Sequence, residues 1–323
     1  MEQQILRGTG ATVSRLCLGT MTFGQQVDET EAARMVDRAL EAGVSFIDTA
    51  DAYVGGRSEE ILGRALKGKR DRIVLASKVA SLSGADRHRD AGLHRWHVMR
   101  GVEASLRRLQ TDCLDILHMH HPDRSTPIEE TLAAFDALVQ QGKVVYVGMS
   151  NHASWQVCEA MWKAQVHQWA PPVVVQVPYN LLTRSIEEEC VAFTLKMNVG
   201  MAVYNPLAGG LLTGKHSRAA GPPSGTRFDL NAGYRSRFWW DANFEAVAQL
   251  GRIAAEAGKT LVELSLQWLL SQPHVDSVIL GVSRMEQLEQ NLSAAEGRLS
   301  ADILAACDAV WKGLRGSHFA YNR

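Results

Sequence analysis

The stretch Phe46-Ile-Asp-Thr-Ala-Asp-Ala-Tyr53 begins as a short apolar run and ends in a polar loop that carries a phenol. Short apolar runs are typical of strands buried on both faces of a parallel sheet. Asp48 then falls at the carboxyl end of such a strand, where α/β barrels place their chemistry, and Tyr53 falls in the loop just beyond. The stretch therefore predicts a parallel α/β fold and the end of the fold that carries the site.

Two later stretches have the same form. Ile73-Val-Leu-Ala-Ser-Lys78 closes on an ammonium, and Leu114-Asp-Ile-Leu-His-Met-His120 closes on an imidazole. Because the carboxyl ends of parallel strands meet at one end of a barrel, we expect Lys78 and His120 to lie near Asp48. Together with the phenol, these groups are a set that an oxidoreductase would need.

The whole chain alternates apolar runs with amphipathic stretches, which predicts βα units and a parallel sheet. Eight strands are expected, at residues 16–19, 45–48, 73–78, 113–120, 144–150, 173–178, 200–204 and 278–280. Amphipathic helices are expected at 31–42, 58–66, 98–109, 128–141, 154–166 and 186–197. Eight parallel strands with helices outside them indicate a closed (β/α)8 barrel.

No linker, low-complexity segment or change of composition divides the chain, so we expect residues 1–323 to form one α/β domain. An N-terminal β-hairpin should precede the barrel. A long loop, 205–241, follows the seventh strand, which favours a lid or binding loop on the active face. A helix at 299–311 and an aromatic, basic tail at 317–323 should end the chain.

Composition excludes several classes of protein. A formal net charge of -1 offers no basic surface for nucleic acid, and no apolar run is long enough to cross a membrane. The amino terminus lacks the pattern of a secretory signal, so we expect a cytoplasmic protein. The five cysteines, Cys17, Cys113, Cys158, Cys190 and Cys307, are widely spaced, which fits reduced thiols better than disulfides or a zinc cluster. A homo-oligomer is compatible with the sequence, which leaves the number of subunits open.

The chain resembles the aldo-keto reductases, single-domain TIM barrels that use NADPH, over nearly its whole length. The stretches that carry the resemblance are Leu18-Gly-Thr-Met-Thr-Phe-Gly24, Ile47-Asp-Thr-Ala-Asp-Ala-Tyr53, Leu117-His-Met-His-His-Pro-Asp123, Gly142-Lys-Val-Val-Tyr-Val-Gly-Met-Ser-Asn151, Gln176-Val-Pro-Tyr-Asn180 and Ile279-Leu-Gly-Val-Ser-Arg-Met-Glu-Gln-Leu-Glu-Gln-Asn291. The second half is most similar to the branch of aflatoxin-aldehyde and succinic-semialdehyde reductases. Residues 204–215 and 234–239 and the ending Asn322-Arg323 carry that narrower likeness.

The resemblance implies that four residues act as a catalytic unit. Tyr53 matches the proton donor, and we expect the Lys78 ammonium to lower the pKa of its phenol. Asp48 would pair with Lys78, and His120 would donate a hydrogen bond to the substrate carbonyl. A simpler interpretation makes Asp48 and Lys78 a structural ion pair at the barrel rim and Tyr53 a packed loop aromatic.

No Gly-x-Gly-x-x-Gly motif follows a strand, so a dinucleotide would not bind as it does in a Rossmann fold. By resemblance, Ser150, Asn151 and Gln176 would hydrogen-bond the nicotinamide, and Tyr204 would stack on its ring. The remaining residues expected at the cofactor are Thr20, Met21, Asp48, Asn205, Leu207, Ala208, Gly210, Lys215, Gly281, Ser283, Arg284, Gln287, Gln290 and Asn291. A simpler interpretation makes Ser150 and Asn151 a helix N-cap and Gln176 a turn residue.

The nucleotide is expected to be NADPH rather than NADH, because Ser283 and Arg284 suit a 2′-phosphate at a helix start. The alternative is that Arg284 is a solvated surface side chain.

Substrate selection is expected to come from loops at the barrel mouth. The residues expected at the substrate are Met21, His121, Arg235, Arg237, Trp239, Tyr321 and Arg323, and three further aromatics, Phe23, Trp240 and Phe319, could also line an apolar cavity. The three arginines resemble carboxylate-binding positions, which favours carboxylated or aromatic aldehydes. Ordinary packing of the aromatics is the alternative.

Two other functions stay open on the sequence alone. His118 and His120 share a strand face, with His121 on the other, so a metal-dependent barrel hydrolase is conceivable. The other strand ends offer poor partners for a catalytic metal, so no metal is expected. The family also includes potassium-channel β subunits, so a noncatalytic NADPH-binding regulatory subunit is the second alternative.

Overall fold

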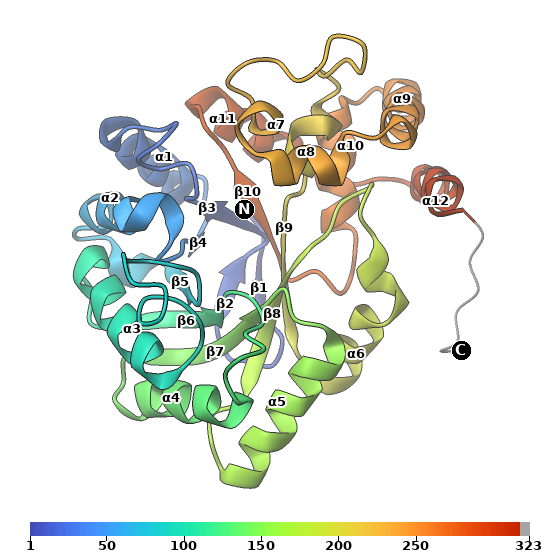
Figure 1. The fold of residues 1–323 in the computed structure, drawn as a ribbon. Helices are drawn as coiled ribbons and strands as arrows, with labels where there is room; N and C mark the ends of the chain where they lie inside the picture. The colour runs from blue at the N-terminus through green and yellow to red at the C-terminus, as the bar shows by residue number, and fades with distance from the viewer. Residues whose placement is uncertain (317–323) are drawn as a thin grey trace.

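The computed structural model describes residues 1–316, and at its centre eight parallel strands form a closed barrel (Figure 1). The strands are β3 (Leu16–Gly19), β4 (Phe46–Asp48), β5 (Val74–Val79), β6 (Leu114–Met119), β7 (Val144–Ser150), β8 (Pro172–Pro178), β9 (Gly200–Tyr204) and β10 (Ser277–Gly281). Each strand pairs with its neighbours in the chain, and β10 closes the barrel against β3. The predicted (β/α)8 barrel is therefore confirmed, with every expected strand placed within one residue at each end.

Helices surround the barrel, as Figure 1 shows. They are α1 (Glu29–Glu41), α2 (Arg57–Ala65), α3 (Arg95–Leu109), α4 (Ile128–Gln140), α5 (Ser154–His167), α6 (Cys190–Met197), α10 (Leu261–Leu270) and α11 (Met285–Ala294). Their sequence pattern explains their position. In α1, for example, Ala32, Met35, Val36 and Ala39 recur at helical spacing and are all buried, while Asp28 caps the first turn by accepting from the Glu31 N–H.

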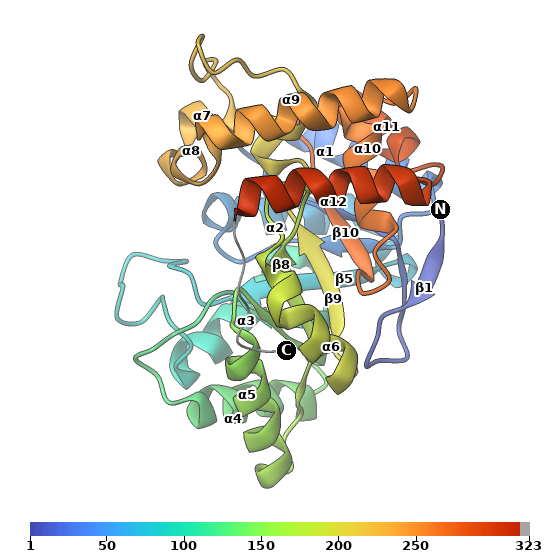
Figure 2. The same ribbon diagram turned by 90° about the vertical axis from the view of Figure 1, so that its right-hand side faces the viewer.

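Three features of the helical layer differ from the sequence analysis or extend it. The helix expected at 186–197 divides into a 3-10 turn, η3 (Ser185–Glu188), and α6. Neither α10 nor α9 (Asp241–Glu256) was among the expected helices. The expected C-terminal helix is α12 (Ala301–Arg315), and Figure 2 shows it running alongside α9.

A short hairpin of β1 (Gln3–Ile5) and β2 (Thr12–Ser14) precedes the barrel, as expected. Leu6 and Val13 are fully buried and belong to the same apolar cluster as Cys17 and Phe46 on the barrel strands. Apolar side chains from the hairpin therefore continue the core of the barrel. Figure 2 shows β1 and helices α7 and α8 at opposite ends of the barrel, so the hairpin lies away from the carboxyl ends of the strands.

The long segment after β9 lies at the carboxyl end of the barrel and holds three short helical pieces. They are η4 (Ala208–Thr213), α7 (Arg227–Leu230) and α8 (Ala232–Phe238). Two more 3-10 turns, η1 (Tyr53–Gly56) and η2 (Arg70–Arg72), flank α2. Within the described residues, no helix is long and apolar enough to cross a membrane.

Candidate active site

The inside of the barrel changes from apolar to polar toward the carboxyl ends of the strands. Phe46, Ala76 and Ile116 belong to the buried apolar cluster inside the barrel. Two residues further along each strand, on the same face, stand Asp48, Lys78 and His118. A strand register that aligns Asp48 with Ala76 and Lys78 with His118 brings these polar residues to neighbouring heights. The site therefore begins where this apolar layer stops.

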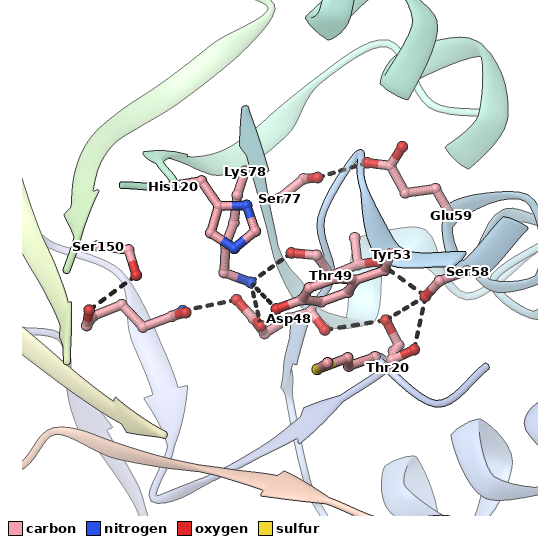
Figure 3. Close-up of polar contacts among 12 residues, drawn as sticks. Thr20, Asp48, Thr49, Tyr53, Ser58, Glu59, Ser77, Lys78, His120 and Ser150 are labelled. Carbon is pink, nitrogen blue, oxygen red and sulfur yellow. Dashed lines mark hydrogen bonds and ion pairs between the residues drawn. The ribbon is translucent and has the colours of Figure 1, made fainter. Parts of the chain in front are cut away.

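Lys78 is the centre of a hydrogen-bond network (Figure 3). Its ammonium donates to Asp48 Oδ2 at 2.6 Å, to the Thr49 carbonyl at 2.7 Å and to the Tyr53 hydroxyl at 3.0 Å. The residue is 1% exposed. Three bonds use all three N–H groups of the ammonium, so the Lys78 side chain is held in one position.

The network continues to strands on the far side of the site. The second carboxylate oxygen of Asp48 accepts from Gln176 Nε2 at 2.8 Å. The Ser150 hydroxyl donates to the Gln176 carbonyl at 3.0 Å. Strands β4, β5, β7 and β8 are thus linked by polar contacts in a single buried layer.

Tyr53 lies in a tight turn that begins directly after β4. Val54 in this turn has a φ of 51°, and both following glycines also have positive φ, a conformation that costs least at glycine. The ring of Tyr53 meets the ring of His120 edge-on, with centroids 5.9 Å apart. The turn brings the phenol hydroxyl to the Lys78 ammonium, and the His120 imidazole lies nearby (Figure 3).

Burial dominates the acid–base properties of the site. Burial raises the pKa of Tyr53 above its ordinary value, and the lowering by Lys78 does not offset it, so the expected net lowering is not found. Burial alone would lower the pKa of Lys78, but Asp48 and Tyr53 raise it above its ordinary value. Burial, and then Lys78, lower the pKa of His120 to about 3. At neutral pH the site therefore holds a neutral phenol, a cationic lysine and a neutral imidazole.

A second buried polar layer supports the turn, and the sequence analysis did not single it out. The Ser58 hydroxyl donates to the Thr20 carbonyl at 2.7 Å, and Glu59 accepts from Ser77 Oγ at 2.6 Å (Figure 3). Glu59 is fully buried and pairs with Arg108 at 2.7 Å. The signal available in the sequence was the pair Ser58-Glu59 at the start of α2, where a buried carboxylate needs a partner.

A cavity of about 940 Å³ opens above this network. Its lining includes Asp48, Tyr53 and His120, whereas Lys78 lies behind them. Every residue expected at a cofactor lines this cavity except Ala208, which is fully buried. A second cavity of about 850 Å³ lies near the N-terminus, and none of the expected site residues that the structure describes lines it.

One end of the cavity has amide and hydroxyl groups that suit a nicotinamide. Asn151, which has a φ of 62°, donates from Nδ2 to the His120 carbonyl at 2.9 Å and accepts from the Tyr204 hydroxyl at 2.7 Å. Ser150 and Gln176 lie beside it in the cavity lining. These contacts fix Tyr204 and Asn151 relative to the His120 strand end.

The other end of the cavity suits a phosphate. Helix α11 begins here, and its N-cap residue, Arg284, makes no side-chain cap hydrogen bond. The Gln287 side chain accepts from the Ser283 N–H at 2.8 Å, which orders the turn before the helix. An uncapped helix N-terminus beside an arginine and a serine favours an anion. Lys215 adds a cation in the same lining, so the donor set fits a phosphorylated dinucleotide.

Only some of the residues expected at the substrate line the cavity. Met21, His121 and Arg237 line the cavity, but Arg235 does not. Trp239 is buried against Phe228 and Phe244 and is likewise absent from the lining. Three expected residues, Phe319, Tyr321 and Arg323, lie outside the described residues.

The other two aromatics do not line the cavity either: Phe23 is fully buried and Trp240 is 61% exposed. The sequence analysis missed Arg227 and Tyr234, which do line it. Arg227 donates to the Tyr234 hydroxyl at 3.2 Å and reaches Met21 Sδ at 3.9 Å. This contact connects α7 with the loop after β3 across the cavity.

His118 lies inside the barrel. It is 0% exposed, and within the described part of the chain both its ring nitrogens are buried without a hydrogen-bond partner. Its ring occupies the space beside Gly148, where an added Cβ would lie 2.2 Å from Nδ1. Among residues 1–316, no group of three or more histidine, cysteine or acidic side chains comes together in a way that could hold a metal ion.

Comparison with known proteins agrees with this geometry. A model of the aldo/keto reductase family matches residues 15–312. Aflatoxin B1 aldehyde reductase member 2 of Homo sapiens is 38% identical over 312 residues, which cover 91% of this chain and 85% of the relative. A probable voltage-gated potassium channel subunit beta of Arabidopsis thaliana is 37% identical over 303 residues, with 92% of each chain covered. The uncharacterized oxidoreductase YrpG of Bacillus subtilis is 36% identical over 98% of each chain.

Proposed function

The chain belongs to the aldo/keto reductase family, and from this membership we propose that it reduces aldehydes and ketones to alcohols with NADPH, using Tyr53 as the proton donor. The observation that carries the proposal is the position of the Tyr53 hydroxyl, 3.0 Å from the Lys78 ammonium and in the lining of the large cavity. Reduction of a carbonyl builds negative charge on its oxygen, so a donor beside that oxygen is what the reaction needs.

The cofactor would lie along the cavity. Ser150, Asn151 and Gln176 would hold its carboxamide end, Tyr204 would stack on the ring, and the α11 N-terminus would hold the phosphate of its adenosine end. Bound NADPH supplies the hydride. The glycine-rich turn η4 supports this arrangement, because Gly209 and Gly210 have positive φ and let the backbone come close to a ligand.

The four residues of the network have distinct roles in this proposal. Burial keeps the Tyr53 phenol protonated, so it has a proton to give to the carbonyl oxygen. Lys78 stays cationic and stabilises the phenolate left behind, and Asp48 holds Lys78 in place. A neutral His120 donates a hydrogen bond that orients the carbonyl.

Preference for NADPH over NADH is part of the proposal. Ser283 and Arg284 lie together where α11 begins, and the 2′-phosphate is the group by which the two nucleotides differ. A guanidinium fork and an uncapped helix start both favour a phosphate there.

A carboxylated or aromatic aldehyde is the substrate class that the cavity favours. Arg237 and Arg227 flank Tyr234, with their guanidinium carbons 5.8 Å and 4.8 Å from its ring centre, and all three line the cavity. A guanidinium recognises a carboxylate bidentately. Met21 and His121 complete the substrate end, whereas Arg235 and Trp239 are not part of the proposal because they do not line the cavity.

A noncatalytic regulatory subunit that binds NADPH is the second candidate. The relatives named as potassium channel subunits are the observation that favours it. The intact network of Asp48, Tyr53, Lys78 and His120 favours turnover instead. A homo-oligomer and a cytoplasmic location remain predictions from the sequence.

The test is to follow NADPH absorbance with a panel of aldehydes and ketones, comparing the native chain with Tyr53→Phe. We expect Tyr53→Phe to lower kcat by roughly 10²- to 10⁴-fold while NADPH still binds. Tyr146→Phe, on β7 outside the cavity, is the matched control and should keep full activity. Tight NADPH binding without turnover across the panel would favour the regulatory subunit, and loss of activity with a chelator would favour a metal enzyme.

A further inference from the structure

The loop that follows β5 approaches the candidate active site through a conformation that is unusual for its residues. Ala80 is 1% exposed and has a φ of 155°, in a region that residues with a side chain rarely adopt. Hydrogen bonds fix the backbone on both sides of it. The Gly92 N–H donates to the Ala80 carbonyl at 2.7 Å, and the His120 N–H donates to the Val79 carbonyl at 3.0 Å. The strained residue directly precedes Ser81.

Ser81 contacts the imidazole at the centre of the site. Its Oγ lies 3.4 Å from Nδ1 of His120, within hydrogen-bonding distance. Within residues 1–316, the His120 ring makes no other hydrogen bond, and neither does the Ser81 hydroxyl. The hydroxyl can donate to the ring nitrogen, and no competing acceptor in that part of the chain draws its hydrogen away.

The contact matters because a neutral imidazole has only one N–H. Burial keeps His120 neutral at physiological pH, as described above. When one ring nitrogen accepts a hydrogen bond, the proton must reside on the other. A hydroxyl that donates to Nδ1 therefore leaves the N–H on Nε2, and His120 lines the cavity in which a carbonyl would lie.

We propose that Ser81 is a positioning residue that fixes the ring orientation and the Nε2–H tautomer of His120, so that the imidazole presents a donor to the substrate carbonyl. The proposal rests on the function proposed above for His120. The backbone conformation of Ala80 directs the Ser81 side chain toward the ring. Without the hydroxyl, the ring is free to take the other tautomer, which offers a lone pair where the carbonyl oxygen needs a donor.

Nitrogen-15 NMR of histidine-labelled protein tests the tautomer without any turnover. Protonated and unprotonated nitrogens of a neutral imidazole resonate at well-separated frequencies, and the His120 signals are identified by their loss in His120→Gln. We expect Nδ1 to be the unprotonated nitrogen in the native chain. The two signals should move toward averaged positions in Ser81→Ala and return in Ser81→Thr. A protonated Nδ1 in the native chain overturns the proposal, and so does an unchanged spectrum in Ser81→Ala.

The same loop offers a matched control. Ser83 Oγ lies 3.2 Å from Nε2 of His97, a buried histidine that does not line the cavity. Ser83→Ala should move the signals of His97 and leave those of His120 in place. Movement of the His120 signals in Ser83→Ala would mean that the loop as a whole, and not the Ser81 hydroxyl, determines the orientation and tautomer of the His120 ring.

Kinetics separate this inference from the proposed function. In Ser81→Ala we expect kcat for aldehydes to fall by roughly threefold to tenfold, which is the scale of one net hydrogen bond. The KM for NADPH should stay unchanged. Ser81→Thr keeps the hydroxyl and should therefore keep the activity. If the native chain lacks turnover but the tautomer responds to Ser81, the reductase proposal fails and the ring-positioning contact stands. If turnover is normal and the tautomer ignores Ser81, the inference fails alone.

Discussion

Lys78 Nζ lies 2.6 Å from Asp48 Oδ2, and the two side chains are 1% and 4% exposed. Two charges buried this deeply lose their hydration, so each depends on the other and on further hydrogen bonds. Gln176 supplies one to Asp48, and Thr49 and Tyr53 accept from Lys78. The pair is therefore both the electrostatic centre of the site and a point at which the fold is vulnerable.

Removing one partner of this pair should destabilise the fold strongly. In Lys78→Met the Asp48 carboxylate is left buried without its counter-ion, and we expect the free energy of unfolding to fall by about 3–5 kcal/mol. The double variant Asp48→Asn with Lys78→Met should recover part of that loss. Urea unfolding of the single and double variants measures the coupling.

The control is an exposed ion pair. Arg34 and Glu31 lie 2.7 Å apart on α1, with side chains 66% and 27% exposed. Arg34→Met should cost at most about 1 kcal/mol, because solvent screens the pair. Strictly additive effects of the two buried substitutions would contradict the interdependence described above.

Gly148 and His118 should behave as a complementary pair in the barrel core. An added Cβ at Gly148 would lie 2.2 Å from His118 Nδ1, so we expect Gly148→Ala to lower the free energy of unfolding by about 1–3 kcal/mol through overpacking. In a His118→Ala background the clash disappears, and Gly148→Ala should then be nearly neutral. Gly313→Ala is the control, because no atom of residues 1–316 lies within 4 Å of its added Cβ. Equal costs of Gly148→Ala in both backgrounds would rule out the pairing.

This pairing also marks a limit of what the sequence could predict. The apolar runs were sufficient to place all eight strands, because a strand buried on both faces needs a short continuous apolar segment. They also placed Asp48 and Lys78 at strand ends that meet. The match of His118 with Gly148 depends on the register between β6 and β7, which a single sequence does not encode locally.

The properties that sequence analysis missed come from the environment of each residue. Lys78 was expected to lower the pKa of Tyr53, but the depth of burial, which sequence does not report, has the larger effect. Helix α10 was missed even though Thr260 and Glu263 form a capping box at its start. The contact of Ser81 with His120 depends on the backbone angle of Ala80, and no local pattern would predict that angle.

Arg284 should determine the preference between nucleotides. It lies in the cavity lining at the start of α11, where a 2′-phosphate would be held. We expect Arg284→Ala to raise the KM for NADPH by roughly tenfold to a hundredfold, the scale of a charge-assisted hydrogen bond, and to leave the KM for NADH nearly unchanged. Arg252→Ala, on α9 outside the cavity, is the control. A parallel rise for both nucleotides would argue against a 2′-phosphate contact.

Arg237 and Arg235 offer a matched pair for testing carboxylate recognition. They are two residues apart on α8, but only Arg237 lines the cavity. Arg237→Ala should raise the KM for a carboxylated aldehyde such as succinic semialdehyde by about tenfold or more, and have little effect on a neutral aldehyde of similar length. Arg235→Ala should change neither. Equal effects of Arg237→Ala on both aldehydes would remove the carboxylate from the proposal.

Asp51 should make the stability of the fold depend on pH in the direction opposite to most carboxylates. It is 1% exposed, and burial, followed by the charge of Glu59, raises its pKa to about 8. Between its ordinary pKa of 3.8 and about 8, the folded chain keeps this proton while the unfolded chain has lost it. Stability should therefore fall as pH rises through that range and level off above it.

Asp51→Asn removes this dependence, because the amide does not ionise. The free energy of unfolding of the variant minus that of the native chain should therefore increase with pH. Between pH 5 and pH 8 the increase should be up to about 1.4 kcal/mol per pH unit. Urea unfolding at each pH measures it, with Asp71→Asn at an exposed position as the control. Because the Asp51 N–H donates to the Lys78 carbonyl at 3.2 Å, the turn that carries Tyr53 should loosen as Asp51 ionises. Parallel pH profiles for the native chain and Asp51→Asn would show that this carboxyl is already ionised in the folded state.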